Sequence, residues 1–231
     1  MAIAFINGAN GGTISSTSFS ITLPATQVND IIILEYAHRG TADATLGGTY
    51  AGPACTKKHD QLFASSAFSG KTFWSRATGN HANETVTGSG LTNACAAIVT
   101  IYRGVRGDGD PLGNAAVVGE QNASANETQA QITTTTSGAY VVLVVANSPD
   151  LAVSSQSSTS PGALTERQEV LSTAGTNCSI SHASAGKALP GVTGALTWAQ
   201  TNGASGSWAY ALTPELPIMP IVQSIQQERY V

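Results

Sequence analysis

The run from Ala94 to Tyr102 constrains the fold more than any other stretch of the chain. It holds nine largely apolar residues and stops abruptly at Arg103-Gly104-Val105. A run of this length is too short to span a bilayer, and its β-branched residues favour a strand over a helix. Two further runs have the same character, Ile31–Ala37 and Ala139–Ala146. We therefore predict three central strands that are buried on both faces.

Shorter candidate strands surround these runs and are separated by turns rich in Gly, Asn, Ser and Pro. The chain holds 24 Gly and 9 Pro among 231 residues, and it shows no convincing amphipathic helix. About a dozen strands at this spacing predict an all-β fold, an antiparallel two-sheet sandwich or jelly roll. The shorter strands are expected at Ile3–Ile6, Phe19–Leu23, Lys58–Phe63, Thr72–Ala77, Glu84–Ser89, Ala115–Gly119, Gln129–Thr133, Leu164–Leu171, Ser179–Ala188, Val192–Gln200 and Ser205–Leu212.

Segments rich in turn-forming residues are expected between these strands. Asn7–Gly12 reads as a turn, Arg39–Pro53 as a long loop with a weak strand in it, and Ser154–Gly162 as a loop. Large aromatic side chains should fill the space between the two sheets. The candidates for this role are Phe73, Trp74, Trp198 and Trp208.

The last residues differ from the rest, and we predict a β-sandwich domain over residues 1–214 with an extended C-terminal arm over residues 215–231. Three prolines within seven residues, from Pro214 to Pro220, impose an extended course and prevent pairing inside a sheet. The arm is too apolar for a free end, so it docks either on its own domain or on another chain. The residues expected to bind a partner are Leu216, Ile218, Met219, Ile221, Val222, Ile225 and Tyr230.

The composition narrows the class of partner. Only 10% of the residues are charged, against roughly 25% in a typical soluble protein, and the net charge is −4. Low charge weakens the repulsion between copies and suits a protein that does not live as a free monomer. The 10 Lys and Arg residues are scattered, so neither nucleic acid nor a membrane is an expected partner. The first residues lack the pattern of a secretory signal, and we expect synthesis in the cytoplasm.

No catalytic signature is present, and we expect a protein that is not an enzyme and has no cofactor or metal. The chain contains neither a G-x-S-x-G elbow nor a phosphate-binding glycine loop. Three cysteines are odd in number and fit no zinc or disulfide spacing. Asp108-Gly109-Asp110 has the form of a calcium-loop fragment but lacks the further oxygen ligands, so a tight turn is expected. The four histidines are far apart, and His59 is expected at a solvated strand end.

Four motifs resemble a family of β-sandwich proteins from tailed-phage virions. They are Asp30–Leu34 (Asp-Ile-Ile-Ile-Leu), Phe73–Gly79 (Phe-Trp-Ser-Arg-Ala-Thr-Gly), Ala97–Val105 followed by Asp110-Pro111, and the closing Ala209–Pro214. The resemblance covers roughly residues 15–214 and implies a jelly-roll module of a head decoration protein or a fibre. Its motifs are structural, and no catalytic residue carries over.

The resemblance implies a structural protein of a bacteriophage virion. The first expectation is a head decoration (cement) protein that binds the major capsid protein or other virion proteins, stabilises the shell and forms a homo-oligomer, with a trimer favoured. The alternative is a tail fibre or adhesin module that binds host glycan, for which Tyr50, Phe68 and Tyr210 are stacking candidates. A carbohydrate-active enzyme would require a pair of carboxylates in a cleft.

Overall fold

The computed structural model describes residues 2–11, 17–63, 68–113, 117–171 and 178–215. Within these ranges the regular elements are β-strands joined in antiparallel pairs, which confirms the predicted all-β sandwich. The jelly-roll connectivity stays a prediction. No helix in this part of the chain is long and apolar enough to cross a membrane.

The first large sheet has the order β1-β8-β3-β6-β5. Two of the predicted buried runs form its centre, and every residue of β3 is buried. Such strands carry apolar residues on both faces because both faces of the sheet are covered. The strands are β1 (Ala4–Gly11), β3 (Ile31–His38), β5 (Thr56–Phe63), β6 (Phe68–Arg76) and β8 (Cys95–Arg103).

The second large sheet has the order β12-β16-β11-β14-β13, and β9 pairs with β16 as well. The third predicted run, β11, lies at its centre between β16 and β14. The strands are β9 (Val117–Gln129), β11 (Ala139–Ser148), β12 (Val153–Ser158), β13 (Thr165–Val170), β14 (Ser179–Lys187) and β16 (Leu196–Leu212).

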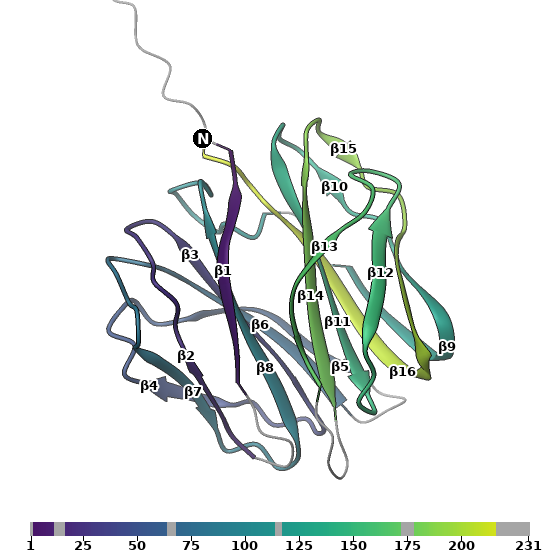
Figure 1. Cartoon of the computed structure of the whole chain (residues 1–231), viewed down its shortest axis with the longest axis horizontal. Coiled ribbons are helices and arrows are strands. Elements are labelled where there is room, and N and C mark those ends of the chain that lie inside the picture. The colour runs from purple at the N-terminus through teal and green to yellow at the C-terminus, as the bar shows by residue number, and fades with distance from the viewer. Residues whose placement is uncertain (1, 12–16, 64–67, 114–116, 172–177, 216–231) are drawn as a thin grey trace, which may run out of the picture.

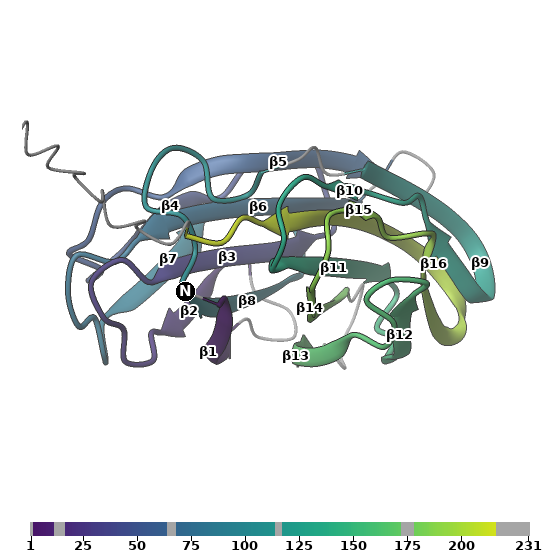
Figure 2. The same cartoon turned by 90° about the horizontal axis from the view of Figure 1, so that it is seen from above.

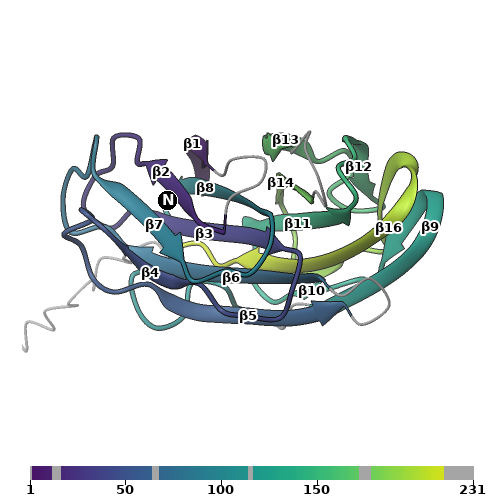
Figure 3. The same ribbon diagram turned by 90° about the horizontal axis from the view of Figure 1, so that it is seen from below.

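The two large sheets pack face to face around one apolar core, to which Ile33, Phe68, Val144 and Trp208 contribute. Two smaller sheets complete the molecule. They are formed by β2 (Phe19–Thr22), β7 (Thr85–Ser89) and β4 (Thr45–Gly48), and by β10 (Thr133–Thr134) with β15 (Gly191–Val192). In Figure 1, β1, β3 and β8 of the first large sheet lie to the left, and β11, β12, β14 and β16 of the second lie to the right. The views from above and below place β2, β4 and β7 at one extreme and β9, β12 and β16 at the other (Figures 2 and 3).

The aromatic side chains are distributed over several cores, which corrects the expectation that all four fill the inter-sheet space. Trp208 lies in the inner core, and Trp74 is partly buried against it. Phe73 lies on the other face of the first sheet, and Trp198 on the other face of the second. The expectation did not allow for both outer faces being covered.

Several expected turns are strand interiors instead. β1 continues through Gly8, where an added Cβ would lie 2.7 Å from Gln168, so glycine permits close packing there. β16 runs unbroken through Gly203, whose Cβ would meet Leu151 at 2.5 Å. β9 continues from the expected strand at 115–119 through residues 120–128, where no strand was expected, and it ends at Gln129. The expected loop at residues 154–162 contains most of β12. The predicted weak strand between Arg39 and Pro53 is present as β4.

One end of the sandwich gathers several strand termini. β3 begins opposite the ends of β8 and β6, since Ile31 pairs with both Tyr102 and Arg76. β16 ends at Leu212, which pairs with Tyr140 at the start of β11. We call this face of the molecule the terminal end. It lies at the top of Figure 1, with the N-terminus, β10 and β15.

Candidate functional site at the terminal end

A buried aspartate and an arginine join two central strands at the terminal end. Asp30 directly precedes β3, and Arg103 is the last residue of β8. The Nε of Arg103 donates to Oδ1 of Asp30 at 2.7 Å, and its second guanidinium nitrogen donates to Oδ2 at 2.8 Å. The Asp30 side chain is fully buried, whereas 33% of the Arg103 side chain is exposed. A bidentate arginine–carboxylate pair fixes the relative orientation of the two side chains as well as their distance. It therefore holds the start of β3 next to the end of β8.

A second arginine connects this pair to the loop after β8. Arg76, the last residue of β6, donates to the carbonyl oxygen of Asn29 at 3.3 Å and to that of Arg106 at 2.6 Å. Burial lowers the pKa of Arg76, while the nearby carboxylates of Asp108 and Glu215 act in the opposite direction. One guanidinium therefore holds two loops together through their backbone.

The last described residues, 213–215, run along the same loop. The Arg106 amide donates to the Thr213 carbonyl at 2.9 Å, and the Glu215 amide donates to the Gly104 carbonyl at 2.9 Å. An isolated antiparallel bridge lies between these two hydrogen bonds. Residues 213–215 are thus held against this loop by backbone hydrogen bonds on both sides of Pro214.

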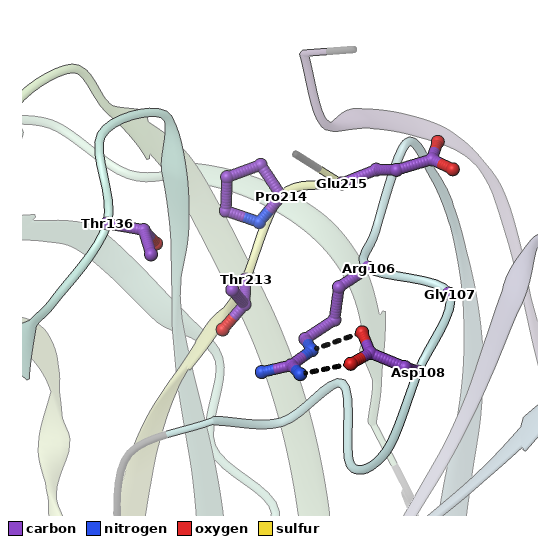
Figure 4. A pocket seen from close by; sticks show the side chains of 7 residues that line it. All are labelled: Arg106, Gly107, Asp108, Thr136, Thr213, Pro214 and Glu215. Atoms are coloured by element: carbon purple, nitrogen blue, oxygen red, sulfur yellow. Dashed lines mark hydrogen bonds and ion pairs between the residues drawn. The ribbon is translucent and has the colours of Figure 1, made fainter. Parts of the chain in front are cut away.

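A pocket of about 450 Å³ opens beside this anchored segment (Figure 4). The Arg106 guanidinium contacts the Asp108 carboxylate at 3.1 and 2.8 Å, and these hydrogen bonds lower the pKa of Asp108. A proline ring and threonine side chains form other parts of the wall, which suits a peptide segment better than a reacting group. The lining residues are Arg106, Gly107, Asp108, Thr136, Thr213, Pro214 and Glu215.

The four motifs that carry the resemblance meet at this end of the molecule. Asp30 opens the first motif, Arg76 lies in the second, Arg103 lies in the third and Pro214 closes the fourth. The sequence indicates each motif as a structural element, but it does not indicate that they touch. Their contacts depend on the pairing of β3 with both β6 and β8.

The predicted Asp108-Gly109-Asp110 turn forms a bend at the rim of the pocket. Asp108 pairs with Arg106, Asp110 pairs with Lys58, and Asp110 also accepts the Leu112 amide at 2.9 Å. Across the described ranges, no group of three or more His, Cys, Asp and Glu residues is arranged to hold a metal ion. The residues predicted to bind a partner, Leu216, Ile218, Met219, Ile221, Val222, Ile225 and Tyr230, lie outside the described residues.

A polar network inside the sandwich is the feature that sequence reasoning missed. Glu35 of β3 and His182 of β14 are fully buried, and the carboxylate Oε2 lies 2.6 Å from Nδ1 of the imidazole. The Tyr210 hydroxyl donates to Oε1 of Glu35 at 2.7 Å. Burial raises the pKa of Tyr210 well above its usual value, so this hydroxyl keeps its proton. The partners come from both large sheets, and the network therefore connects the two layers.

The network continues from His182 to a second tyrosine, a serine and an arginine. The Tyr102 hydroxyl donates to Ser184 Oγ at 2.8 Å and lies 2.6 Å from Nε2 of His182. Arg167 donates to the same Ser184 oxygen at 3.0 Å. These contacts extend the network from β14 to Tyr102 of β8 and to Arg167 of β13.

A second histidine also faces the inter-sheet space, which corrects its expected place at a solvated strand end. The ring of His59 stacks on Tyr210 with their centroids 5.9 Å apart. Burial, with a smaller contribution from the Lys58 charge, lowers the pKa of His59 to about 4. His59 follows an irregularity in β5, where the pairing with β6 shifts register between Lys57 and His59.

One sequence signal for this network exists. Glu35 is a charged residue inside a run that is buried on both faces. Such a residue requires a buried partner, but His182 lies 147 positions away and no spacing links the two. Two of the suggested sugar-stacking residues, Phe68 and Tyr210, are also inside the core. Tyr50 lines a separate pocket of about 240 Å³ with Leu46, Val86, Cys55 and neighbouring residues.

Comparisons of the chain with protein-family models, with curated proteins and with solved structures found no match.

Proposed function

We propose that this chain is a structural protein of a tailed-phage virion, a head decoration protein that binds the capsid surface and stabilises the shell. The observation that carries the proposal is the junction of Asp30, Arg76, Arg103 and Pro214. Chance matches to four motifs would scatter over a fold. Here Arg103 pairs with Asp30, and Arg76 binds the carbonyl oxygen of the preceding Asn29. Arg76 also binds the Arg106 carbonyl, and the neighbouring Val105 bridges Pro214, so the ends of the motifs lie together.

The junction gives the C-terminal residues a fixed point of departure. An extended arm covers much surface per residue, and such arms join neighbouring subunits on a shell. If half of the arm's apolar side chains are buried on a partner at ~1.5–3 kcal/mol each, the gross gain is on the order of 6–12 kcal/mol before ordering costs.

The low charge of the chain supports the same proposal. With 10% charged residues and a net charge of −4, neighbouring copies repel one another weakly. A protein that coats a shell is held beside many copies of itself, so weak repulsion favours dense occupancy.

The test is the content of particles purified from the natural source of the chain. We expect the full-length chain to sediment with filled heads in a fixed copy number, measured by quantitative mass spectrometry. Deletion of residues 216–231 keeps every described contact and should abolish occupancy. Particles without the chain would overturn the proposal, and antibody labelling confined to tails would replace it with the fibre alternative.

A further inference from the structure

The terminal end carries exposed apolar side chains on both sides of the anchored C-terminal segment. Of the five large hydrophobic residues that are exposed in the described ranges, three lie here: Val28 at 62%, Leu189 at 71% and Val192 at 52%. Leu189 precedes β15, and Val192 is its last residue. β15 pairs with β10, which ends shortly before Thr136 in the pocket wall. Exposed apolar groups gathered around a pocket indicate an interaction surface.

Hydrogen bonds connect these residues to the pocket. Val28 precedes Asn29. The Arg76 guanidinium donates both to the Asn29 carbonyl oxygen and to the Arg106 carbonyl oxygen. On the other side, the Gly138 amide donates to the Ala188 carbonyl at 3.1 Å. An added Cβ on Gly138 would lie 3.9 Å from the Pro214 ring, so this loop packs against the anchored segment. The apolar residues and the pocket thus belong to one surface.

The chain beyond Glu215 supplies an occupant of matching chemistry. Sixteen residues follow, and seven of them are the apolar residues predicted to bind a partner. Leu216 and Met219 each precede a proline, which restricts them to extended conformations. The sequence therefore predicts that the first residues of the arm are extended, at roughly 3 Å per residue. An arm of this kind reaches a neighbouring molecule more readily than it reverses into its own pocket.

We propose that the terminal end receives the C-terminal residues 216–231 of a second copy of this chain. The inference rests on the proposed function, because it names the partner of the same arm. Each copy gives its arm to one neighbour and receives an arm from another, and such a head-to-tail contact closes into a ring when the rotation permits. The pocket takes an apolar side chain of the incoming arm, while Leu189 and Val192 cover its flank.

The first test measures the mass of the purified chain by light scattering over a wide range of concentrations. We expect a multiple of 23.5 kDa for the full chain. Two variants, the chain lacking residues 216–231 and the Leu189→Asp/Val192→Asp variant, should each have the mass of a single copy of that variant. The matched control is Leu62→Asp, an equally polar change at a residue 48% exposed near the opposite end of the sandwich. It should keep the mass of the full chain.

Mixing separates an exchanged arm from one that docks on its own chain. The Leu189→Asp/Val192→Asp variant has an arm but a blocked end, and the truncated chain has an open end but no arm. We expect each to be monomeric alone and the mixture to form a complex containing both. A monomeric full chain, an oligomer that survives the truncation, or no complex on mixing would overturn the inference. A monomeric chain that still coats particles would leave the proposed function standing.

Discussion

Asp30 has no exposed surface, yet it carries a carboxylate at the point where three strands meet the terminal end. Its two oxygens accept from Arg103, and Oδ2 also accepts the Gln27 amide at 2.8 Å. Asp30→Ala removes all three bonds. Breaking a fully buried pair costs ~3–5 kcal/mol, but Arg103 is partly exposed and regains water, so we expect a loss of about 2–3 kcal/mol in the free energy of unfolding.

Urea unfolding of Asp30→Ala measures this loss directly. Asp108→Asn is the matched control, because it also removes a carboxylate from an arginine pair at the same end, but from a side chain that is 84% exposed. We expect the control to unfold like the parent chain. Equal stability of both variants would show that the buried pair does not hold the junction.

His59 makes the stability of the sandwich dependent on pH. Burial lowers its pKa to about 4 in the folded chain, below the usual value of 6.5. The unfolded chain therefore binds more protons between these two values, and the contribution of His59 to stability is complete above pH 6.5 and is lost as the pH falls toward 4. By pH 4.5 this loss amounts to about 2–3 kcal/mol.

His59→Gln should remove this part of the pH dependence. We expect the variant to lose less unfolding free energy than the parent between pH 7 and pH 4.5, by urea unfolding at each pH. His38 remains in both proteins, and burial lowers its pKa as well, so some acid sensitivity persists. Parallel stability curves for the two proteins would contradict the inward placement of His59.

Single residues also show where sequence reasoning stops. The turn at Asp108-Gly109-Asp110 was predictable because the neighbouring sequence lacks the further oxygen ligands of a calcium loop. Local residue spacing is enough to show this. The partners of Glu35 and Asp30 do not follow, because they depend on the pairing of strands that are far apart in the chain. His182 and Arg103 reach these carboxylates only after both sheets have formed.

At the level of strands, glycine in this protein often marks close contact between elements. Gly70 in β6 faces Trp208 of β16, and an added Cβ would lie 2.3 Å from the indole ring. Trp208 is fully buried between the sheets and cannot move freely. We expect Gly70→Ala to lower the free energy of unfolding by about 1–3 kcal/mol through overpacking.

Gly79→Ala is the control for this effect, since an added Cβ at that position meets no atom within 4 Å. Thermal unfolding of the two variants compares them directly. Because only Gly70→Ala overpacks the core, we expect it to melt at a lower temperature than Gly79→Ala. Equal melting temperatures would mean that the two large sheets are less tightly packed at Trp208 than the structure indicates.

The same use of glycine explains which strands were predictable. The three apolar runs correspond to β3, β8 and β11. They were predictable because a continuous apolar run of this length indicates by itself a strand buried on both faces. β1 and β16 were cut short in the prediction because Gly8 and Gly203 resemble turn residues. Only the packing of Gln168 and Leu151 against them shows otherwise.

At the scale of the whole molecule, the layers and the terminal end have different roles. The large sheets are locked together by Trp208 and by the Glu35–His182 network. The terminal end instead has an open pocket, exposed apolar side chains and an anchored segment at residues 213–215. The all-β architecture was predictable from composition and spacing. The convergence of the four motifs on one end was not, because it follows from sheet order.

The position of the arm in the assembled particle tests the account most directly. A photo-cross-linking amino acid at Ile218 should join the chain to a neighbouring molecule. The mass of the denatured product shows whether a second chain is attached, and mass spectrometry of the linked peptides identifies the residues in contact. We predict links from Ile218 to the terminal end of a second copy, around Thr136 and Leu189, in particles that carry the chain. Links confined to the same chain would contradict the claim that the C-terminal arm joins one molecule to the next.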